Sequence, residues 1–308
     1  MNFPSSFSAV RWIALPALLA ATSAAQTASA PVLGWTLAQD GQSIQRISGV
    51  PGAARTDPPV RLPDDLSNVR LNPTQSVALA LAGDRRIPVL VNLDAPEQRT
   101  ALADAVANPD DAAWSPSGSS LALLYRDARR IQVYGFEAGA LQFRSELTAA
   151  ADRVAVSDDG LAMLAATSAG LSLYQGGDAA VLSGSPVSSF TFLAQTAIPA
   201  YWIDGQLRLG GQTLDLPLND GESLFLASPV QGRLVAVRSA SGAIMTFDAA
   251  GQLLSQTAGP ERCECAVSGL EAVGRSGAVR LATVGSGPLW VADSSSAPRL
   301  FFIPVQQQ

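Results

Sequence analysis

The chain has 308 residues, of which 26 are acidic and 20 basic, and its net charge is −6. All the basic residues are arginines, because the sequence contains neither lysine nor histidine. A histidine-based catalytic triad, an imidazole metal ligand, a Schiff-base lysine and a phosphate-binding P-loop are therefore excluded. The negative charge also predicts no nucleic acid partner.

The N-terminus has the pattern of a secretory signal peptide. Arg11 precedes a short apolar run at residues 12–21, and small residues follow as far as Ala25. We expect a signal peptide at residues 1–25 and a linker at residues 26–31. Since the apolar run is too short to cross a bilayer, the sequence predicts an exported protein, periplasmic or extracellular, without a transmembrane segment after signal removal.

The next stretch predicts a β-hairpin at residues 32–47. Asp40-Gly41 separates two alternating apolar runs, which is a strong hairpin signal. We interpret this hairpin as the second half of a blade that lacks its own first half. The Pro/Gly-rich stretch at 49–63 follows, with one short strand expected at 60–62.

Six fuller repeats occupy the rest of the chain, and residues 112–125 show the pattern best. There an apolar strand enters the Ser115-Pro-Ser-Gly118 turn and a second apolar strand leaves it. The corresponding first-hairpin turns are predicted at residues 72–76, 115–118, 157–160, 194–196, 228–232 and 268–269. The strands that open the second hairpin are predicted to start at Val89, Ile131, Leu171, Leu207, Ile244 and Leu289.

These repeats resemble bacterial secreted WD40-like and TolB-like (PD40-type) propellers, whose blades carry a Ser-Pro-Asp-Gly turn before a Leu-Ala pair. The resemblance covers residues 32–305. It implies an all-β fold, a single β-propeller of four-stranded blades over residues 32–306. Seven blades would have about 39 residues each, and the alternative of six would need about 46. In the seven-bladed form we expect strands from both chain ends to complete the first blade.

Charged loops are the main candidate site. Propeller topology places the loops between blades and the middle loop within each blade on one face. The inter-blade loops are acidic, and the middle loops of two consecutive blades are basic. The candidate binding residues are Asp65, Asp110, Asp111, Arg85, Arg86, Arg126, Arg129 and Arg130. They could bind an anionic partner through the planar arginine forks, or neutralise one another as surface ion pairs.

Cys263 and Cys265 are the only cysteines. On a strand their positions would be about 6.5–7 Å apart, at the limit for an unstrained disulfide. A strained local disulfide, two free thiols and a metal or redox site stay open as alternatives. We expect no metal, because further ligands would have to be carboxylates.

The remaining aspartates and tryptophans have ordinary structural explanations. Paired aspartates, as in Ser157-Asp-Asp-Gly160, could be Ca²⁺ ligands or a glycosidase pair, but aspartate at a turn usually hydrogen-bonds its own backbone. Trp35, Trp114, Trp202 and Trp290 are expected to pack between blades.

These observations favour a non-catalytic exported module, monomeric and without a cofactor, that binds a protein or peptide in the cell envelope or outside the cell. The absence of histidine, the commonest general base, lowers the expectation of catalysis. The alternative is a carboxylate-dependent hydrolase or lyase acting in the central channel. Two converging carboxylates at the channel mouth would favour the enzyme.

Overall fold

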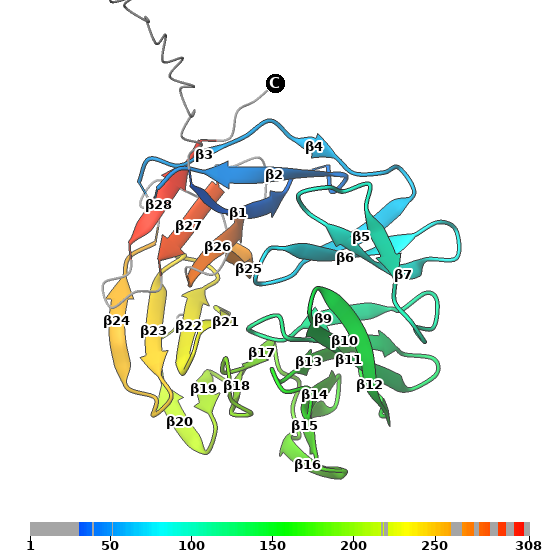
Figure 1. Cartoon of the computed structure of the whole chain (residues 1–308). Helices are drawn as coiled ribbons and strands as arrows, with labels where there is room; N and C mark the ends of the chain where they lie inside the picture. The colour runs from blue at the N-terminus through cyan, green and yellow to red at the C-terminus, as the bar shows by residue number, and fades with distance from the viewer. Residues whose placement is uncertain are drawn as a thin grey trace, which may run out of the picture. The chain divides into compact units, whose positions relative to one another are not determined.

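The protein is an all-β propeller with seven blades (Figure 1). Its computed structural model describes residues 31–38, 40–50, 52–216, 218, 221–259, 267–273, 277–283, 289–293 and 299–304. These residues form 28 strands in seven antiparallel sheets of four. The predicted fold class and the seven-blade count are confirmed. Within the same ranges, no helix has the length and apolar character needed to cross a membrane.

The strands follow one another blade by blade. Blade 1 contains β1 (Val32–Leu37), β2 (Ser43–Ser48), β3 (Arg55–Thr56) and β4 (Val60–Arg61). Blade 2 contains β5 (Leu66–Leu71), β6 (Val77–Ala82), β7 (Ile87–Asn92) and β8 (Arg99–Ala101). Blade 3 contains β9 (Asp111–Trp114), β10 (Ser120–Tyr125), β11 (Arg130–Glu137) and β12 (Ala140–Thr148). Blade 4 contains β13 (Arg153–Val156), β14 (Ala162–Thr167), β15 (Gly170–Gln175) and β16 (Asp178–Ser183). Blade 5 contains β17 (Ser189–Phe192), β18 (Pro199–Ile203), β19 (Gln206–Leu209) and β20 (Gln212–Asp215). Blade 6 contains β21 (Leu224–Val230), β22 (Arg233–Arg238), β23 (Ile244–Asp248) and β24 (Leu253–Thr257). Blade 7 contains β25 (Val267–Val273), β26 (Ala278–Thr283), β27 (Leu289–Asp293) and β28 (Leu300–Ile303).

The first strand of each blade is the innermost one. β1, β5, β9, β13, β17, β21 and β25 lie around the central axis, and contacts join most neighbours in this ring. Because the strands are antiparallel, inter-blade connections and middle loops lie on one face, called here the loop face. The first-hairpin turns and the turns between third and fourth strands lie on the opposite face, called the turn face.

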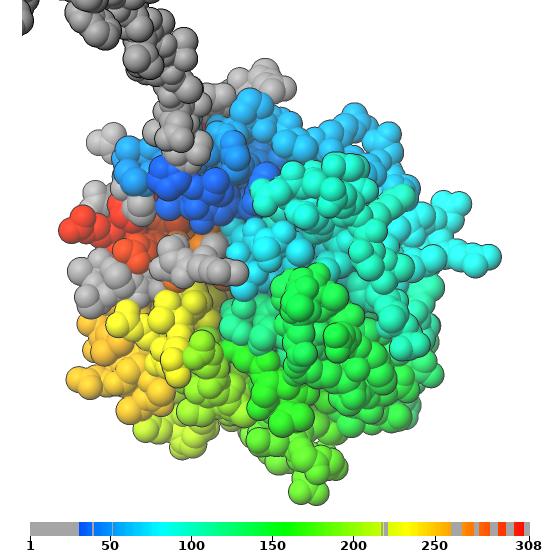
Figure 2. All heavy atoms as spheres, in the orientation of Figure 1, coloured from blue at the N-terminus to red at the C-terminus, as the bar shows by residue number. Residues whose placement is uncertain are grey.

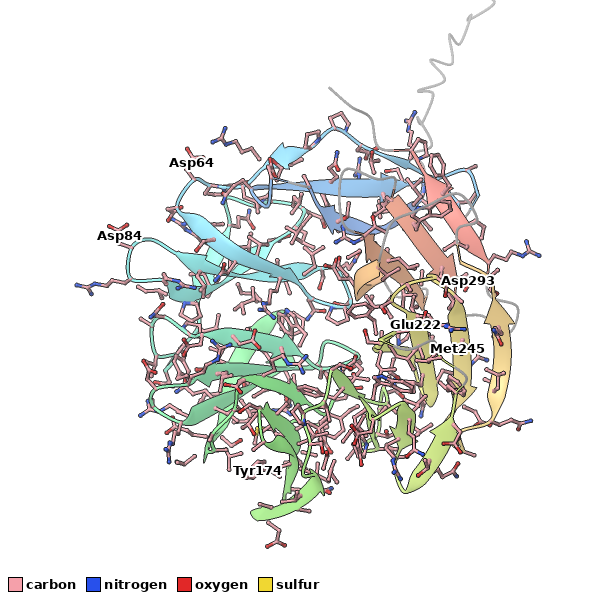
Figure 3. All side chains as sticks on the ribbon, turned by 180° about the vertical axis from the view of Figure 1, so that it is seen from behind. Asp64, Asp84, Tyr174, Glu222, Met245 and Asp293 are labelled. Atoms are coloured by element: carbon pink, nitrogen blue, oxygen red, sulfur yellow. The ribbon has the colours of Figure 1, made fainter. Side chains whose placement is uncertain are left out.

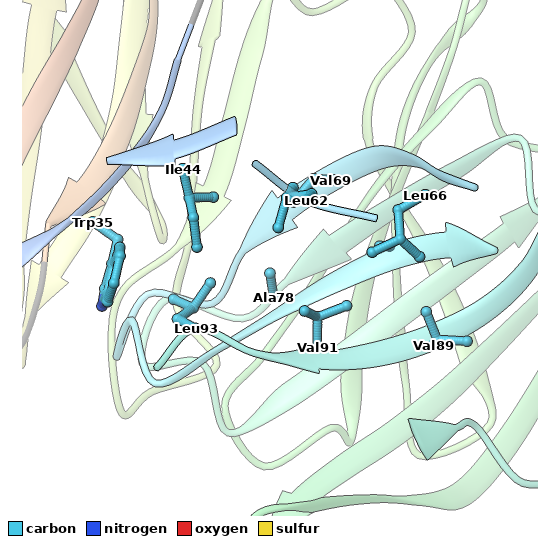
Figure 4. Packing of buried hydrophobic residues seen from close by; sticks show 10 residues of the cluster. Trp35, Ile44, Leu62, Leu66, Val69, Ala78, Val89, Val91 and Leu93 are labelled. Atoms are coloured by element: carbon cyan, nitrogen blue, oxygen red, sulfur yellow. The ribbon is translucent and has the colours of Figure 1, made fainter. Parts of the chain in front are cut away.

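The hydrophobic core is divided among the seven interfaces between blades. Each interface has its own cluster of buried side chains. Figure 4 shows the cluster between blades 1 and 2, where Trp35 and Ile44 face Ala78 and Val91. Since blades pack on both sides, the central strands bury both faces, and runs such as β6 are continuously apolar.

Blade 1 corrects the prediction that strands from both ends would complete it. All four of its strands come from the N-terminal region, and β28 pairs with β27 in blade 7. The hairpin of β1 and β2 is the inner half of the blade. The Pro/Gly-rich stretch supplies two short strands, β3 and β4, which both pair with β2 as a divided outer edge.

Side-chain packing therefore joins blade 7 to blade 1. Ile47 of blade 1 lies in one cluster with Val273, Leu289, Val291 and Ile303 of blade 7. Figures 1 and 2 show blade 1, in dark blue, between blade 7 and blade 2. The expected turn at residues 268–269 is also wrong: both residues lie inside β25, at an irregularity in its pairing with β26.

Hydrogen bonds made at the first-hairpin turns, to neighbouring turns or to innermost strands, join the blades on the turn face. Gln75 of blade 2 accepts from the backbone N of Trp35 in blade 1 and donates to the carbonyl of Ala272 in blade 7, 2.9 Å away. Asn72 donates to the carbonyl of Gly118 in blade 3 at 2.9 Å. The Asp158 carboxylate of blade 4 accepts from backbone N atoms of blades 3 and 5, and Ser228 Oγ of blade 6 accepts from the backbone N of Ala194 in blade 5.

Candidate functional site

The two arginine-bearing middle loops are neighbours on the loop face. The β6–β7 loop carries Arg85 and Arg86, and the carbonyl of Arg86 accepts from the backbone N of Asn108 at 3.0 Å. Two residues further on, Asp110 Oδ2 accepts from the backbone N of Arg126, in the β10–β11 loop, at 2.7 Å. One connection, between β8 and β9, therefore holds both loops.

Buried polar groups fix this connection in place. Tyr125 Oη donates to the carbonyl of Val106 at 2.6 Å, and the amide of Gln132 contacts Val106 N and Asp104 O, each at 3.2 Å. Burial raises the pKa of Tyr125 above its ordinary value, so its hydroxyl stays a donor. Burial likewise raises the pKa of the neighbouring Tyr134 to about 12. Both arginine-bearing loops are therefore hydrogen-bonded to a connection whose position is fixed.

The acids expected to neutralise these arginines have other partners. Asp65 pairs with Arg99 on β8 at 2.6 Å, and Asp111 pairs with Arg70 on β5 at 2.6 Å. Asp110 accepts the backbone hydrogen bond described above. None of the three forms an ion pair with any of the five predicted arginines.

The five predicted arginines fall into two groups. Arg126 donates through its guanidinium to the carbonyl of Asp152 at 2.9 and 3.2 Å, which connects blade 3 to blade 4. Arg130 pairs with Glu146 of β12 at 3.3 Å. Arg85, Arg86 and Arg129 have no carboxylate within ion-pair distance in the part of the chain that the structure describes, and we call these three the arginine patch.

The patch residues occupy matched positions in successive blades. Arg86 and Arg129 each close a four-residue turn by donating their backbone N to the first residue, at 2.9 Å in both loops. Both have positive φ, 52° and 48°. The repeated turn geometry presents equivalent side chains from blades 2 and 3.

Two other loop-face acids have partners within their own blades. Asp152 Oδ2 accepts from the backbone N of Ser168 in blade 4 at 3.2 Å, and Glu222 pairs with Arg238 in blade 6 at 2.5 Å. Figure 3 shows Asp64 and Asp84 at the periphery and Glu222 within the body of the molecule. Asp220 and Glu261, two further acids of the predicted inter-blade loops, lie outside the described residues.

Besides an apolar pocket between blades 7 and 1, two cavities border the innermost strands in the described part of the chain. One, of about 300 Å³, is lined by five inner strands, and Asp111 is its carboxylate. The other, of about 410 Å³, is lined by residues of β1, β5 and β25 and includes Glu271. Each carboxylate pairs with an arginine, Asp111 with Arg70 at 2.6 Å and Glu271 with Arg280 at 2.9 Å. Among the described residues that line these two cavities, no two carboxylates converge as a hydrolase would require.

Sequence reasoning missed the residues of the first cavity. Arg70, Arg153, Phe190 and Phe225 lie on innermost strands and line it together with Trp114, which the sequence assigned to blade packing. Trp114 does pack, edge-on against Phe136 with 6.1 Å between ring centroids, but it also faces the cavity. The sequence feature that could have indicated this cavity is an arginine inside an innermost strand, as Arg70 and Arg153 are.

Two further sequence-level candidates have different outcomes. Asp159 Oδ1 accepts from the backbone N of Leu161 at 2.9 Å and from Ser157 Oγ, as expected for a turn aspartate. Cys263 and Cys265 lie outside the described residues, so their three alternatives stay open.

Comparison with known proteins shows a likeness in fold. No protein-family model matches the chain. No curated protein matches it in sequence.

Solved structures do match. The WD40 repeats of RRP9 have a TM-score of 0.51 at 13% identity, covering 78% of this chain and 81% of that one. U3-55K also has a TM-score of 0.51 at 13% identity, covering 78% and 82%. The Cps50 (Swd1) propeller domain from Myceliophteria thermophila has a TM-score of 0.52 at 13% identity, covering 81% and 89%. At this identity the likeness shows the fold alone, a β-propeller similar to those of WD40 repeat proteins.

Proposed function

We propose that this protein is an interaction module whose arginine patch binds an anionic segment of a partner protein. The observation that carries the proposal is that no described carboxylate forms an ion pair with Arg85, Arg86 or Arg129, while the nearby acids Asp65 and Asp111 pair elsewhere. Each guanidinium offers five N–H donors in a planar fork that suits carboxylates and phosphates. A partner would therefore meet available cationic groups on a rigid scaffold.

A titration with an acidic peptide tests this proposal. The probe is a fluorescent ten-residue poly-aspartate peptide, titrated against the full chain at low and high salt. We expect the Arg85→Ala, Arg86→Ala, Arg129→Ala variant to bind roughly tenfold or more weakly than the unchanged protein, with a flatter salt dependence.

The matched control removes three arginines that already have carboxylate partners. Arg61, Arg99 and Arg144 form ion pairs with Asp64, Asp65 and Glu137. Their triple alanine variant has the same net charge as the patch variant and should bind the peptide nearly as well as the unchanged protein. Equal weakening by both variants would show that only net charge matters, and the patch would not be a docking site.

The proposal includes export of a monomer to the periplasm or the cell exterior and kinship with TolB-like propellers. The signal-like pattern at residues 1–25 and the Ser-Pro-Ser-Gly turn support these points. Expression of the full chain in a bacterium, followed by fractionation and intact-mass measurement, tests export. We expect exported protein that begins at Gln26. Protein that keeps Arg11 and the apolar run, or that stays in the cytoplasm, would contradict this part of the proposal.

A further inference from the structure

The cavity at the centre of the loop face has the composition of a small-ligand site. It has a volume of about 300 Å³ and is lined by residues of blades 2 to 6. Most of these residues lie at or near the start of an innermost strand, as Asp111, Arg153 and Phe225 do. Innermost strands start at the loop face, so the cavity lies toward that face.

Its walls combine apolar and aromatic side chains with polar ones, among them Arg153, Ser188 and Ser189. Trp114, Phe190 and Phe225 line it together with alanine and valine. The indole N–H of Trp114 donates to the carbonyl of Arg70 at 3.2 Å, which fixes the ring. Aromatic walls beside placed polar groups are typical of ligand pockets, and this cavity has room for a ligand about the size of an amino-acid derivative.

One cationic group in the cavity lacks a carboxylate partner. Arg70 and Arg153 both line it, but Arg70 pairs with Asp111 at 2.6 Å. Arg153 donates to the carbonyls of Val187 and Ser188, and its guanidinium lies 5.1 Å from the centroid of the Phe190 ring. No described carboxylate reaches it within ion-pair distance.

These contacts fix the position of the Arg153 guanidinium and leave some of its N–H donors without a described acceptor. Two of its five N–H donors are used by the carbonyls, one on each terminal nitrogen. The Nε hydrogen and the second hydrogen of each terminal nitrogen have no described acceptor. A carboxylate can accept two parallel hydrogen bonds from such a fork. One uncommitted positive charge also matches a monoanion better than a dianion.

We propose that this cavity binds a carboxylate attached to an aromatic or bulky apolar group. Arg153 accepts the carboxylate, and Phe190, Phe225 and Trp114 surround the apolar part. Such a group could be a free aromatic acid or the C-terminal residue of a peptide. The site is distinct from the arginine patch, since the two share no residue.

Calorimetric titration of the full chain tests the charge requirement without a mutation. The probes are N-acetylphenylalanine and its amide, N-acetylphenylalaninamide, which differ in the carboxylate. We expect the acid to bind roughly tenfold or more tightly, because a charge-assisted hydrogen bond is lost in the amide. Acetate should bind more weakly than the acid because it lacks an aromatic part. Equal affinity for acid and amide, or no binding by either, would overturn the proposal.

Variants locate the site and separate it from the patch. Arg153→Gln should lose roughly tenfold or more in affinity for the acid, and Phe190→Leu should lose less. Arg86→Ala should leave acid binding unchanged although it weakens poly-aspartate binding. A folded Arg153→Gln variant with full affinity would contradict the assignment. If the Arg153→Gln variant fails to fold, the ratio of acid affinity to amide affinity, measured on the unchanged protein, still tests the proposal.

Peptide probes distinguish the two sources of the carboxylate. Gly-Gly-Gly-Phe with a free C-terminus is compared with its C-terminal amide and with N-acetylphenylalanine. Tighter binding of the free peptide supports a protein C-terminus as the ligand, and exclusion of the peptide while the small acid binds supports a free aromatic acid.

Discussion

The turn face and the loop face use their acidic side chains differently. On the turn face, Asp158 accepts from the backbone N of Ser117 in blade 3 at 2.7 Å and of Gln195 in blade 5 at 2.5 Å. On the loop face, Asp110 accepts from the backbone N of Arg126 in its own blade. The first joins three blades and the second shapes one loop. Asp158 of the turn face therefore helps to hold neighbouring blades together, whereas Asp110 of the loop face can change with less effect on the ring.

The largest loss of stability is expected for the Asp158→Ala substitution. The substitution leaves two backbone N–H groups of neighbouring blades without their charged acceptor, and we expect a loss of about 2–3 kcal/mol in the free energy of unfolding. Urea denaturation measures it.

Asp159→Ala is the control in the same turn. The Asp159 carboxylate accepts only from Leu161 N and Ser157 Oγ, within blade 4. Its loss should cost about 1 kcal/mol. Equal costs for the two aspartates would remove the distinction between a bridge across blades and a local turn.

The next effect concerns the junction of the first and last blades. Gln75→Ala removes the acceptor of the buried Trp35 N and the donor to Ala272 O, so we expect a loss of about 2 kcal/mol in the free energy of unfolding. Gln195 is a matched control, because it has the same left-handed backbone, φ 59° against 55°, in the corresponding turn. Its side chain is exposed, and Gln195→Ala should change the stability by less than about 0.5 kcal/mol. A cost as large as that at Gln75 would mean that the turn conformation, and not the bridge, sets the stability.

A smaller effect is expected on the loop face. Asp110→Ala removes the acceptor of Arg126 N, an exposed hydrogen bond within one blade. We expect a loss of about 0.5–1 kcal/mol by urea denaturation and faster amide hydrogen exchange at Arg126. A cost close to that of Asp158→Ala would show that the two faces contribute alike to the ring.

The sequence was sufficient for the repeat but not for its closure. Turn signals such as Ser115-Pro-Ser-Gly118 recur at blade spacing, and they predicted the propeller and its seven blades. The hairpin at residues 32–47 was misassigned because the alternation of apolar residues is the same in the inner and outer half of a blade. Its place is set by the packing of Trp35 and Ile44 against blade 2 and of Ile47 against blade 7.

The candidate site, like the fold, was only partly predictable from the sequence. Propeller topology indicated which loops share a face, and the hydrogen bonds through Asn108 and Asp110 show the two arginine loops side by side. The ion pairs were not predictable, because Asp65–Arg99 and Asp111–Arg70 join residues that are 34 and 41 positions apart in the chain. Those ion pairs determine which arginines are left without a carboxylate partner.

The smallest effect on stability is expected where we expect a large effect on binding. Arg86→Ala with Arg129→Ala removes two side chains that have no described carboxylate partner and keeps the turn hydrogen bonds made by their backbones. Both positions have positive φ, which alanine and arginine tolerate about equally, so the free energy of unfolding should change by less than about 0.5 kcal/mol. The same variant should bind the poly-aspartate peptide more weakly, and urea denaturation beside that titration measures both quantities on one sample. A loss of stability above about 1 kcal/mol would show that these arginines hold the ring together. Unchanged stability with weakened binding would leave the loop face free to evolve for recognition while the turn face maintains the propeller.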